Sequence, residues 1–288
     1  MRGEGSGSVK ATLSLVSTLV LTSCARTPSP LDPSHSGSIG LPYRGCLTDA
    51  VEVPDGGTGY HFLRQNDRHY ATPRFADAIE RAAANVALAR PGSTLVIGDM
   101  STRHGGRLLP HLSHRSGHDA DLLLYATTLA GAPVDAPDFV HYGPDGLGWD
   151  AKHERFIRFD VEREWLLVKA LVEDPEARVE WMFANHVIEA LLSEWAIARG
   201  EPSDTILRAE LVLLEPHPGG AHDDHIHVRT ACSAGEEAQG CETGGPLRPW
   251  LSSAFEPPSR SDDELVAILL GPPYASSASS AGAPQASP

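Results

Sequence analysis

The spacing of apolar residues predicts three helices in this chain. Residues 73–89 carry apolar side chains at helical intervals, with a proline at the start and the pair Pro91-Gly92 after the end. This combination predicts an amphipathic helix over that range. The same reasoning predicts helices over residues 160–172 and 185–199.

Shorter apolar and β-branched runs predict a set of strands. One covers residues 94–97, and another begins at Asp121 and reaches Tyr125. The two-residue period of that strand puts Asp119, Asp121 and Leu123 on one face. The set is completed by residues 178–183, 210–215 and 225–230. Connections without helices are short, so we expect an antiparallel sheet. Helices and strands do not alternate strictly, which predicts an α+β fold: a single domain with a small antiparallel sheet flanked by helices.

The ends of the chain differ in composition from its middle. Positive charge at Arg2 and Lys10 precedes an apolar run that is too short to span a bilayer, so residues 1–23 are predicted to be an export signal. Residues 24–41 are rich in Pro, Ser and Gly and are predicted to form a tether. Residues 271–288 are predicted to be a disordered tail. The folded domain is therefore expected over residues 42–270.

The export signal ends in Leu21-Thr22-Ser23-Cys24, which resembles the bacterial lipobox. In that motif the cysteine is lipidated and becomes the new N-terminus, and two or more acyl chains hold a protein on a membrane. Ala25 in second place implies the outer membrane if the host is Gram-negative, and thus a periplasmic lipoprotein anchored at Cys24. The alternative is an ordinary cleaved signal peptide with a chance cysteine.

Three cysteines follow the signal. Export makes disulfides chemically allowed. Cys232 and Cys241 enclose a short loop rich in Gly and Glu, so we pair them. Cys46 is then left over, but it could instead take either of the other two, because sequence alone does not determine connectivity.

The formal net charge of −15 bears on possible partners. Binding to nucleic acid needs a basic face that displaces counterions from the phosphates. An acidic chain therefore argues against nucleic acid as a partner, and otherwise its charge mainly favours solubility.

Two segments about a hundred residues apart carry the candidate chemistry, residues 113–121 and 222–227. Strand alternation puts His225 and His227 on the same side of a strand. His114 and Asp121 lie seven residues apart, and Gly117 between them permits a turn that folds the histidine back toward the aspartate. These side chains suit one zinc ion with a vacant coordination position, which is the catalytic kind of zinc site. The alternative is a histidine-rich loop region without metal.

The same residues carry a family resemblance. His114, Gly117 and Asp121, followed far downstream by His225-x-His227, resemble the zinc peptidases of the lysostaphin, D-Ala-D-Ala peptidase and Sonic-hedgehog type. A longer context narrows the resemblance to the penicillin-insensitive murein endopeptidases, and it comprises residues 98–101, 103–107, 113–121 and 222–229.

This resemblance implies a role for each residue that matches the family pattern. It makes His114, Asp121 and His227 the zinc ligands and His225 the general base, while His222 helps to orient the reacting groups. A neutral histidine suits that task, because its pKa lies near physiological pH. The chain has no His-Glu-x-x-His helix, so the base is not the glutamate of that other class of zinc peptidase.

Several further residues stay open between two interpretations. His111 matches another histidine of the family and is either an additional metal ligand or a hydrogen-bond partner behind the ligands. Asp150 and His153 match an Asp-x-x-His pair that binds further metal in relatives, but they could equally cap the helix that begins nearby. Asp99 and Arg103 either serve substrate or form a structural ion pair.

The function implied by the resemblance is a zinc-dependent peptidoglycan hydrolase that cleaves amide bonds in the cross-links between stem peptides. One alternative is a zinc D,D-carboxypeptidase that trims uncrosslinked stems with the same ligands. Another, of a different class, is a non-catalytic lipoprotein that binds the cell wall with the same scaffold.

Overall fold

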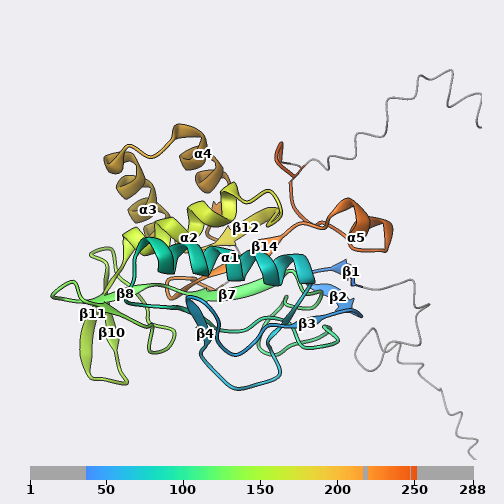
Figure 1. Ribbon diagram of the computed structural model, residues 1–288, viewed down its shortest axis with the longest axis horizontal. Coiled ribbons are helices and arrows are strands. Elements are labelled where there is room, and N and C mark those ends of the chain that lie inside the picture. Colours follow the sequence, from blue (N-terminus) through green and yellow to red (C-terminus); the bar gives the residue numbers. More distant parts are fainter. Residues whose placement is uncertain (1–36, 217–219, 247, 252–288) are drawn as a thin grey trace, which may run out of the picture. The chain divides into compact units, whose positions relative to one another are not determined.

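The computed structural model describes residues 37–216, 220–246 and 248–251 (Figure 1). The predicted export signal, Cys24, the predicted tail and the expected domain end at residue 270 all lie outside the described residues. Strand β1 (Ser38–Leu41) occupies the last part of the predicted tether, because it pairs with β2 (Arg44–Leu47) and because Gly40 exchanges backbone hydrogen bonds with the segment 240–242. Composition does not reveal such long-range pairing.

The central sheet has six strands. Its four inner strands are antiparallel, as expected, but the pair at each edge is parallel, which the sequence reasoning did not predict. In spatial order the strands are β13 (Leu213–Leu214), β12 (Val179–Phe183), β14 (His225–Thr230), β7 (Asp119–Leu123), β6 (Leu95–Ile97) and β4 (Tyr60–Phe62). The α+β fold class is confirmed.

All three predicted helices are present. They are α1 (Pro73–Ala89), α2 (Val161–Glu173) and α3 (His186–Arg199). The side chains of Asp160 and Asn185 cap α2 and α3 by accepting the backbone N–H groups of Arg163 and Val187. Figure 1 shows α1 and α2 side by side along the sheet, and α3 and α4 (Ser203–Val212) pack on α2. A short fifth helix, α5 (Ala234–Ala238), follows the sheet.

The strand predicted over residues 210–215 is largely wrong. Helix α4 continues to Val212, and only the two-residue strand β13 remains. The buried residues Thr205, Ala209 and Val212 recur at helical spacing, which identifies the segment as a helix packed through one face. The run of apolar residues at its end resembles a strand only when it is taken out of that context.

Several short strands were not predicted. A second sheet contains β10 (Leu147–Asp150), β11 (Arg155–Phe159), β8 (Ala126–Thr128) and β9 (Pro133–Val134), and β3 (Val51–Glu52) pairs with β5 (Tyr70–Ala71). Asp150 ends β10, where its carboxylate accepts hydrogen bonds from the backbone and ring of His153 and from Arg155. The interpretation of Asp150 and His153 as a helix cap is therefore wrong, because they brace a β-hairpin and Asp160 caps the helix.

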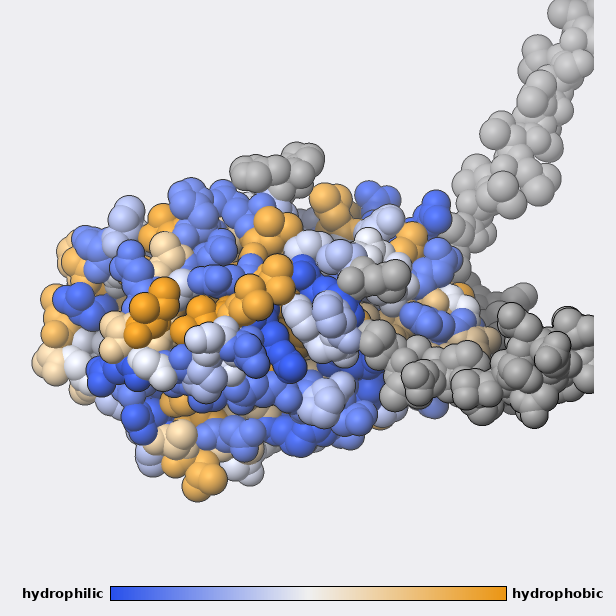
Figure 2. Space-filling model, turned by 90° about the horizontal axis from the view of Figure 1, so that it is seen from above, coloured by the Kyte–Doolittle hydropathy of each residue, from blue (hydrophilic) through white to orange (hydrophobic). Residues whose placement is uncertain are grey.

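The predicted disulfide between Cys232 and Cys241 is present, with a Cα–Cα distance of 6.0 Å. Cys46 lies buried on β2. No helix among the described residues is long and apolar enough to cross a membrane. On the face shown in Figure 2, hydrophilic residues predominate and hydrophobic ones gather in small patches among them.

Glu164 of α2 is a charged residue type in a fully buried position. One carboxylate oxygen accepts the backbone N–H of Tyr125 at 2.9 Å, while the other receives no hydrogen bond from the described residues. Burial raises the pKa of Glu164 to about 8, and the nearby charge of Asp160 adds to the shift although the Tyr125 hydrogen bond opposes it. The folded protein therefore holds a proton that the unfolded chain releases above its ordinary glutamate pKa.

We expect the Glu164→Gln substitution to flatten the pH dependence of stability. In the wild type, the stabilisation by protonated Glu164 is present below pH 4.5 and is lost as the pH rises toward 8, by about 1.4 kcal/mol for each unit of pKa elevation. Glutamine removes this loss, so the variant gains on the wild type at pH 8. Urea unfolding at pH 5 and pH 8 measures the effect, and exposed Glu154→Gln serves as control. An equal pH dependence in wild type and variant would contradict the expectation.

Candidate metal and catalytic site

The candidate site is built on the neighbouring antiparallel strands β7 and β14. In their register His227 lies opposite Asp121, and Arg229 lies opposite Asp119. Residues directly opposite each other in an antiparallel pair project from the same face of the sheet, and the two-residue period adds His225 to that face. The two sequence segments therefore meet through strand pairing.

His114 reaches the same place from the loop before β7. Gly117 has a φ of 79°, and a side chain there would approach Leu47 to 2.8 Å, so the turn requires glycine. His114 itself has a φ of 61°, and its backbone N–H donates to the Asp119 carboxylate at 2.8 Å. The fully buried imidazole lies 3.2 Å from Asp121 through Nε2. The expected turn, which folds the loop histidine back toward the strand aspartate, is observed.

Three donor atoms converge at this point. His114 Nε2 lies 3.2 Å from Asp121 Oδ1 and 3.2 Å from His227 Nδ1, and the latter two atoms are 2.9 Å apart. Ligands about 2.0–2.1 Å from a tetrahedral zinc ion stand about 3.3 Å from one another. Two imidazole nitrogens and a carboxylate oxygen at these separations fit such an ion. Burial by itself would raise the pKa of Asp121, but the three neighbouring histidines hold it well below its usual value, so it is an anion.

Asp119 supports this arrangement from the neighbouring position on β7. Its Oδ1 accepts from His227 Nε2 at 2.9 Å and from Arg229 Nε at 2.7 Å. Holding Nε2 in this way turns Nδ1 of His227 toward Asp121, as carboxylates commonly do behind a metal-binding histidine. Sequence reasoning placed Asp119 on the right strand face but assigned it no role. The Asp-x-Asp alternation was the signal that could have revealed it.

His225 and His222 lie beside the three converging atoms. His225 Nε2 is 3.5 Å from Asp121 Oδ1, and its Nδ1 donates to Asp224 at 2.5 Å. Burial lowers the pKa of His225, but the hydrogen bonds and charges of Asp121 and Asp224 outweigh it and raise the pKa to about 9. His222 packs its ring 4.9 Å from that of His225 and donates Nδ1 to the Gly220 carbonyl. Burial lowers the pKa of His222, so this imidazole is neutral at physiological pH.

His111 lies between two carboxylates. Its Nε2 is 2.8 Å from Asp99 and its Nδ1 is 3.6 Å from the second oxygen of Asp121. Asp99 also accepts from Arg68 at 2.7 Å. Burial raises the pKa of Asp99, but His111 and Arg68 lower it more, to about 2. Asp99 thus forms an ion pair, but its partner is Arg68 and not Arg103, which is exposed elsewhere.

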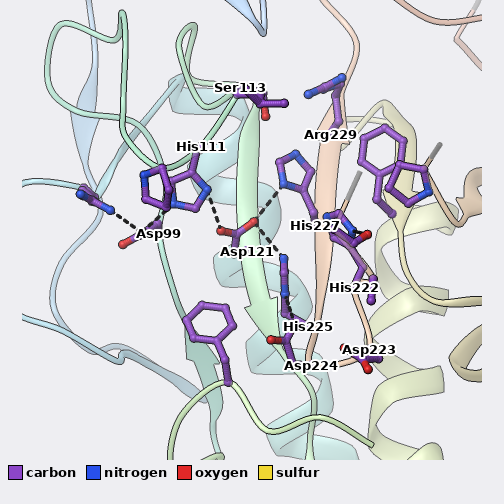
Figure 3. Close-up of a pocket in the computed structure, with 18 of the residues that line it drawn as sticks. Asp99, His111, Ser113, Asp121, His222, Asp223, Asp224, His225, His227 and Arg229 are labelled. Atoms are coloured by element: carbon purple, nitrogen blue, oxygen red, sulfur yellow. Dashed lines mark hydrogen bonds and ion pairs between the residues drawn. The ribbon is translucent and has the colours of Figure 1, made fainter. Parts of the chain in front are cut away.

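These side chains face an open pocket of about 890 Å³. Figure 3 shows His111, His225 and His227 directed toward Asp121 on its floor. Aromatic and cationic residues complete the walls, among them Tyr43, Phe139, Phe183, Arg64, Arg68 and Arg229. The pocket therefore offers two buried carboxylates, Asp99 and Asp121, together with several imidazoles and cationic side chains to a ligand.

Comparison with known proteins decides the family. The family model of the penicillin-insensitive murein endopeptidases matches residues 38–250. The chain belongs to this family. A penicillin-insensitive murein endopeptidase of Haemophilus influenzae is 31% identical over 246 residues, which cover 81% of this chain and 78% of that protein. Proteins of the same name from Klebsiella pneumoniae strain 342 and Salmonella paratyphi C are each 29% identical, covering 86% and 78% of this chain and 86% and 79% of their own lengths.

The structure brings together all six residues that the sequence singled out for this family's site. His111, Asp121, His222, His225 and His227 line the pocket. His114 is fully buried and reaches the site through Asp121 and His227. Asp150, His153 and Arg103 do not line it. Asp119, Asp224 and Arg68 are the participants that sequence reasoning missed, because each acts through a neighbouring side chain.

Proposed function

We propose that this protein is a zinc-dependent endopeptidase that cleaves amide bonds in the cross-links between peptidoglycan stem peptides. The observation that carries the proposal is the convergence of His114 Nε2, Asp121 Oδ1 and His227 Nδ1 within 3.2 Å of one another. The family match supports the peptidase activity, and the relatives' names indicate murein as the substrate.

His114, Asp121 and His227 would hold the metal. When bound there, zinc supplies Lewis-acid polarisation of the scissile carbonyl and acidifies a water molecule. His225 presents Nε2 toward the same point. A cation bound at Asp121 would offset the carboxylate charge that raises the pKa of His225, and the neutral imidazole would then accept a proton from the attacking water and deliver it to the leaving amine. Asp224 holds Nδ1 of His225, which fixes the ring orientation for both transfers.

The other residues of the site orient the reacting groups. Neutral His222 packs its ring at a tilt against that of His225 at the pocket wall. Because its Nδ1 donates to the Gly220 carbonyl, its Nε2 can accept a hydrogen bond from a reacting group. His111 Nε2 is held by Asp99 at 2.8 Å, and its Nδ1 stands 3.6 Å from the second oxygen of Asp121. Its ligand atom lies close enough to those of His114 and Asp121 for all three to hold one ion, so His111 is a further candidate ligand. Catalysis in this scheme needs no serine nucleophile, which agrees with a penicillin-insensitive enzyme.

Digestion of purified cross-linked muropeptide dimers tests the proposed reaction. Monomeric products are expected from an endopeptidase, whereas loss of a terminal D-alanine from uncrosslinked stems would make the protein a D,D-carboxypeptidase. Zinc analysis of the purified domain tests the metal. A stoichiometry near zero in zinc-replete buffer would leave only a non-catalytic cell-wall-binding protein with this scaffold.

We expect Asp119→Ala to weaken zinc binding by about 10–100-fold, the usual effect of removing a carboxylate behind a histidine ligand. Without Asp119, His227 loses the partner of its Nε2 and is no longer held with Nδ1 toward Asp121. Competition with a chelator measures the affinity, and exposed Asp49→Ala is the control. An unchanged zinc affinity would show that Asp119 does not orient the ligand.

For the location, we propose an outer-membrane lipoprotein of the periplasm, anchored through acyl chains at Cys24. The mature protein should then partition into detergent, and Cys24→Ser should release it to the soluble fraction, because the anchor resides in the acyl chains. Metabolic labelling with a fatty-acid analogue measures the modification. A wild-type protein that takes up no label would overturn the lipoprotein assignment.

A further inference from the structure

Arg229 continues the row of functional residues on β14. His225, His227 and Arg229 are alternate residues of one strand and project from the same face. Successive members of such a row stand about 6.6 Å apart along the strand. Figure 3 accordingly places Arg229 beside His227, on the side away from His225.

The guanidinium group of Arg229 is held in position before any ligand arrives. Its Nε donates to Asp119 at 2.7 Å, and the group lies over the ring of Phe183, 5.3 Å from the centroid. The side chain is 14% exposed, so it is fixed at the pocket wall and not free in solvent. Its two terminal amino groups make no hydrogen bond to any described residue. A planar fork of donors thus faces the pocket, the arrangement that matches a carboxylate.

The other two arginines of the pocket are arranged differently. Arg68 is engaged through both terminal nitrogens, with Asp99 at 2.7 Å and the Leu109 carbonyl at 3.0 Å. Arg64 is 48% exposed and its nearest carboxylate, that of Asp138, is 3.6 Å away. Ordering Arg64 on a ligand would cost side-chain entropy that Arg229 has already lost. Arg229 is therefore the pocket arginine best prepared to bind an anion.

We propose that Arg229 binds a carboxylate of the peptide substrate, on the side of the scissile bond opposite the leaving amine. The assignment of a peptide rests on the proposed function. His225 serves the leaving amine at one end of the row, so the acyl part of the substrate extends past His227 toward Arg229. Peptidoglycan stem peptides carry free carboxylates, and a chain with a net charge of −15 needs a local cation to seat such a group. The subsite thus selects anionic peptides in an acidic protein.

Binding measured without turnover tests this subsite. The zinc-loaded full chain with His225→Ala is titrated calorimetrically with a cross-linked muropeptide dimer and with the same dimer after conversion of its carboxylates to primary amides. The free acid should bind at least tenfold more tightly, the effect of one charge-assisted fork. Adding Arg229→Gln should abolish that preference. Adding Arg229→Lys should keep part of it, because lysine retains the charge but not the fork.

The controls separate recognition from structural support and from catalysis. Zinc content and melting temperature are measured for each variant. If Arg229→Gln loses zinc or does not fold, the preference for the free acid is compared between Arg229→Lys and the chain with Arg229 intact instead. Arg64→Ala should leave the preference for the free acid intact. Three results would each overturn the proposal. The acid and the amide bind equally when Arg229 is intact, the preference for the acid survives Arg229→Gln, or that preference disappears in Arg64→Ala. Cleavage by the chain with His225 intact is assayed separately. Binding that depends on the carboxylate but is not followed by cleavage would refute the proposed reaction and leave the Arg229 subsite standing.

Discussion

Replacing His225 by alanine should leave bound zinc near the wild-type level while the rate of cross-link cleavage falls by roughly 10²–10⁴, the usual contribution of a positioned general acid–base group. The three converging donor atoms that we propose as ligands belong to His114, Asp121 and His227, and His225 Nε2 stands 3.5 Å from the shared carboxylate oxygen. The substitution removes the proton carrier and leaves those atoms in place. The pH–rate profile should also lose one ionisation, since a protonated His225 cannot accept a proton.

Metal content and turnover are measured on the same preparation of the His225→Ala variant. His153→Ala is a matched control, because His153 belongs to the β10–β11 hairpin and does not line the pocket. If zinc disappears together with activity, His225 is a ligand. His222, whose ring packs against that of His225, then becomes the better candidate for the base.

Each of the substitutions His114→Ala, Asp121→Ala and His227→Ala should remove zinc and activity together. Three protein ligands leave no redundancy, so the loss of one leaves an under-coordinated ion. Asp121→Ala should have the largest effect, because its Oδ1 lies within 3.5 Å of a ring nitrogen of each of His114, His225 and His227. Without the Asp121 carboxylate, the site loses the negative charge that compensates the positive charge of a bound metal ion.

Zinc analysis after exhaustive dialysis, followed by the muropeptide assay, measures this result. Asp150→Ala is the control, since that carboxylate braces a hairpin away from the pocket. A ligand variant that retains both stoichiometric zinc and turnover would refute the assignment at that position. Melting curves of each variant distinguish loss of the metal from loss of the fold.

Local sequence patterns predicted the helices and strands whose start, end and apolar spacing are marked by their own residues or by those directly beside them. The helix at 73–89 was predicted to the residue because a proline begins it, an apolar stripe runs along it and Pro91-Gly92 follows its end. The His-x-His strand at 225–230 was predicted with equal accuracy. The helix that ends at Val212 was not predicted, because the apolar residues at its end fit a strand equally well until their packing is known.

The sequence by itself determined the faces on which the candidate ligands lie. Alternation along a strand fixes that His225 and His227 share a side, and Gly117 allows the turn that returns His114 to Asp121. These are relations between residues a few positions apart, so backbone geometry alone decides them.

Only the tertiary structure decided which residues contact the candidate ligands from behind. The pairing of β7 with β14 sets His227 opposite Asp121 and Arg229 opposite Asp119, across more than a hundred residues of chain. It thereby gave Asp119 its role as partner of His227 and left the Arg229 fork directed into the pocket. Such contacts depend on register between distant strands, and register is set by the packing of the whole sheet and not by the residues on either strand alone.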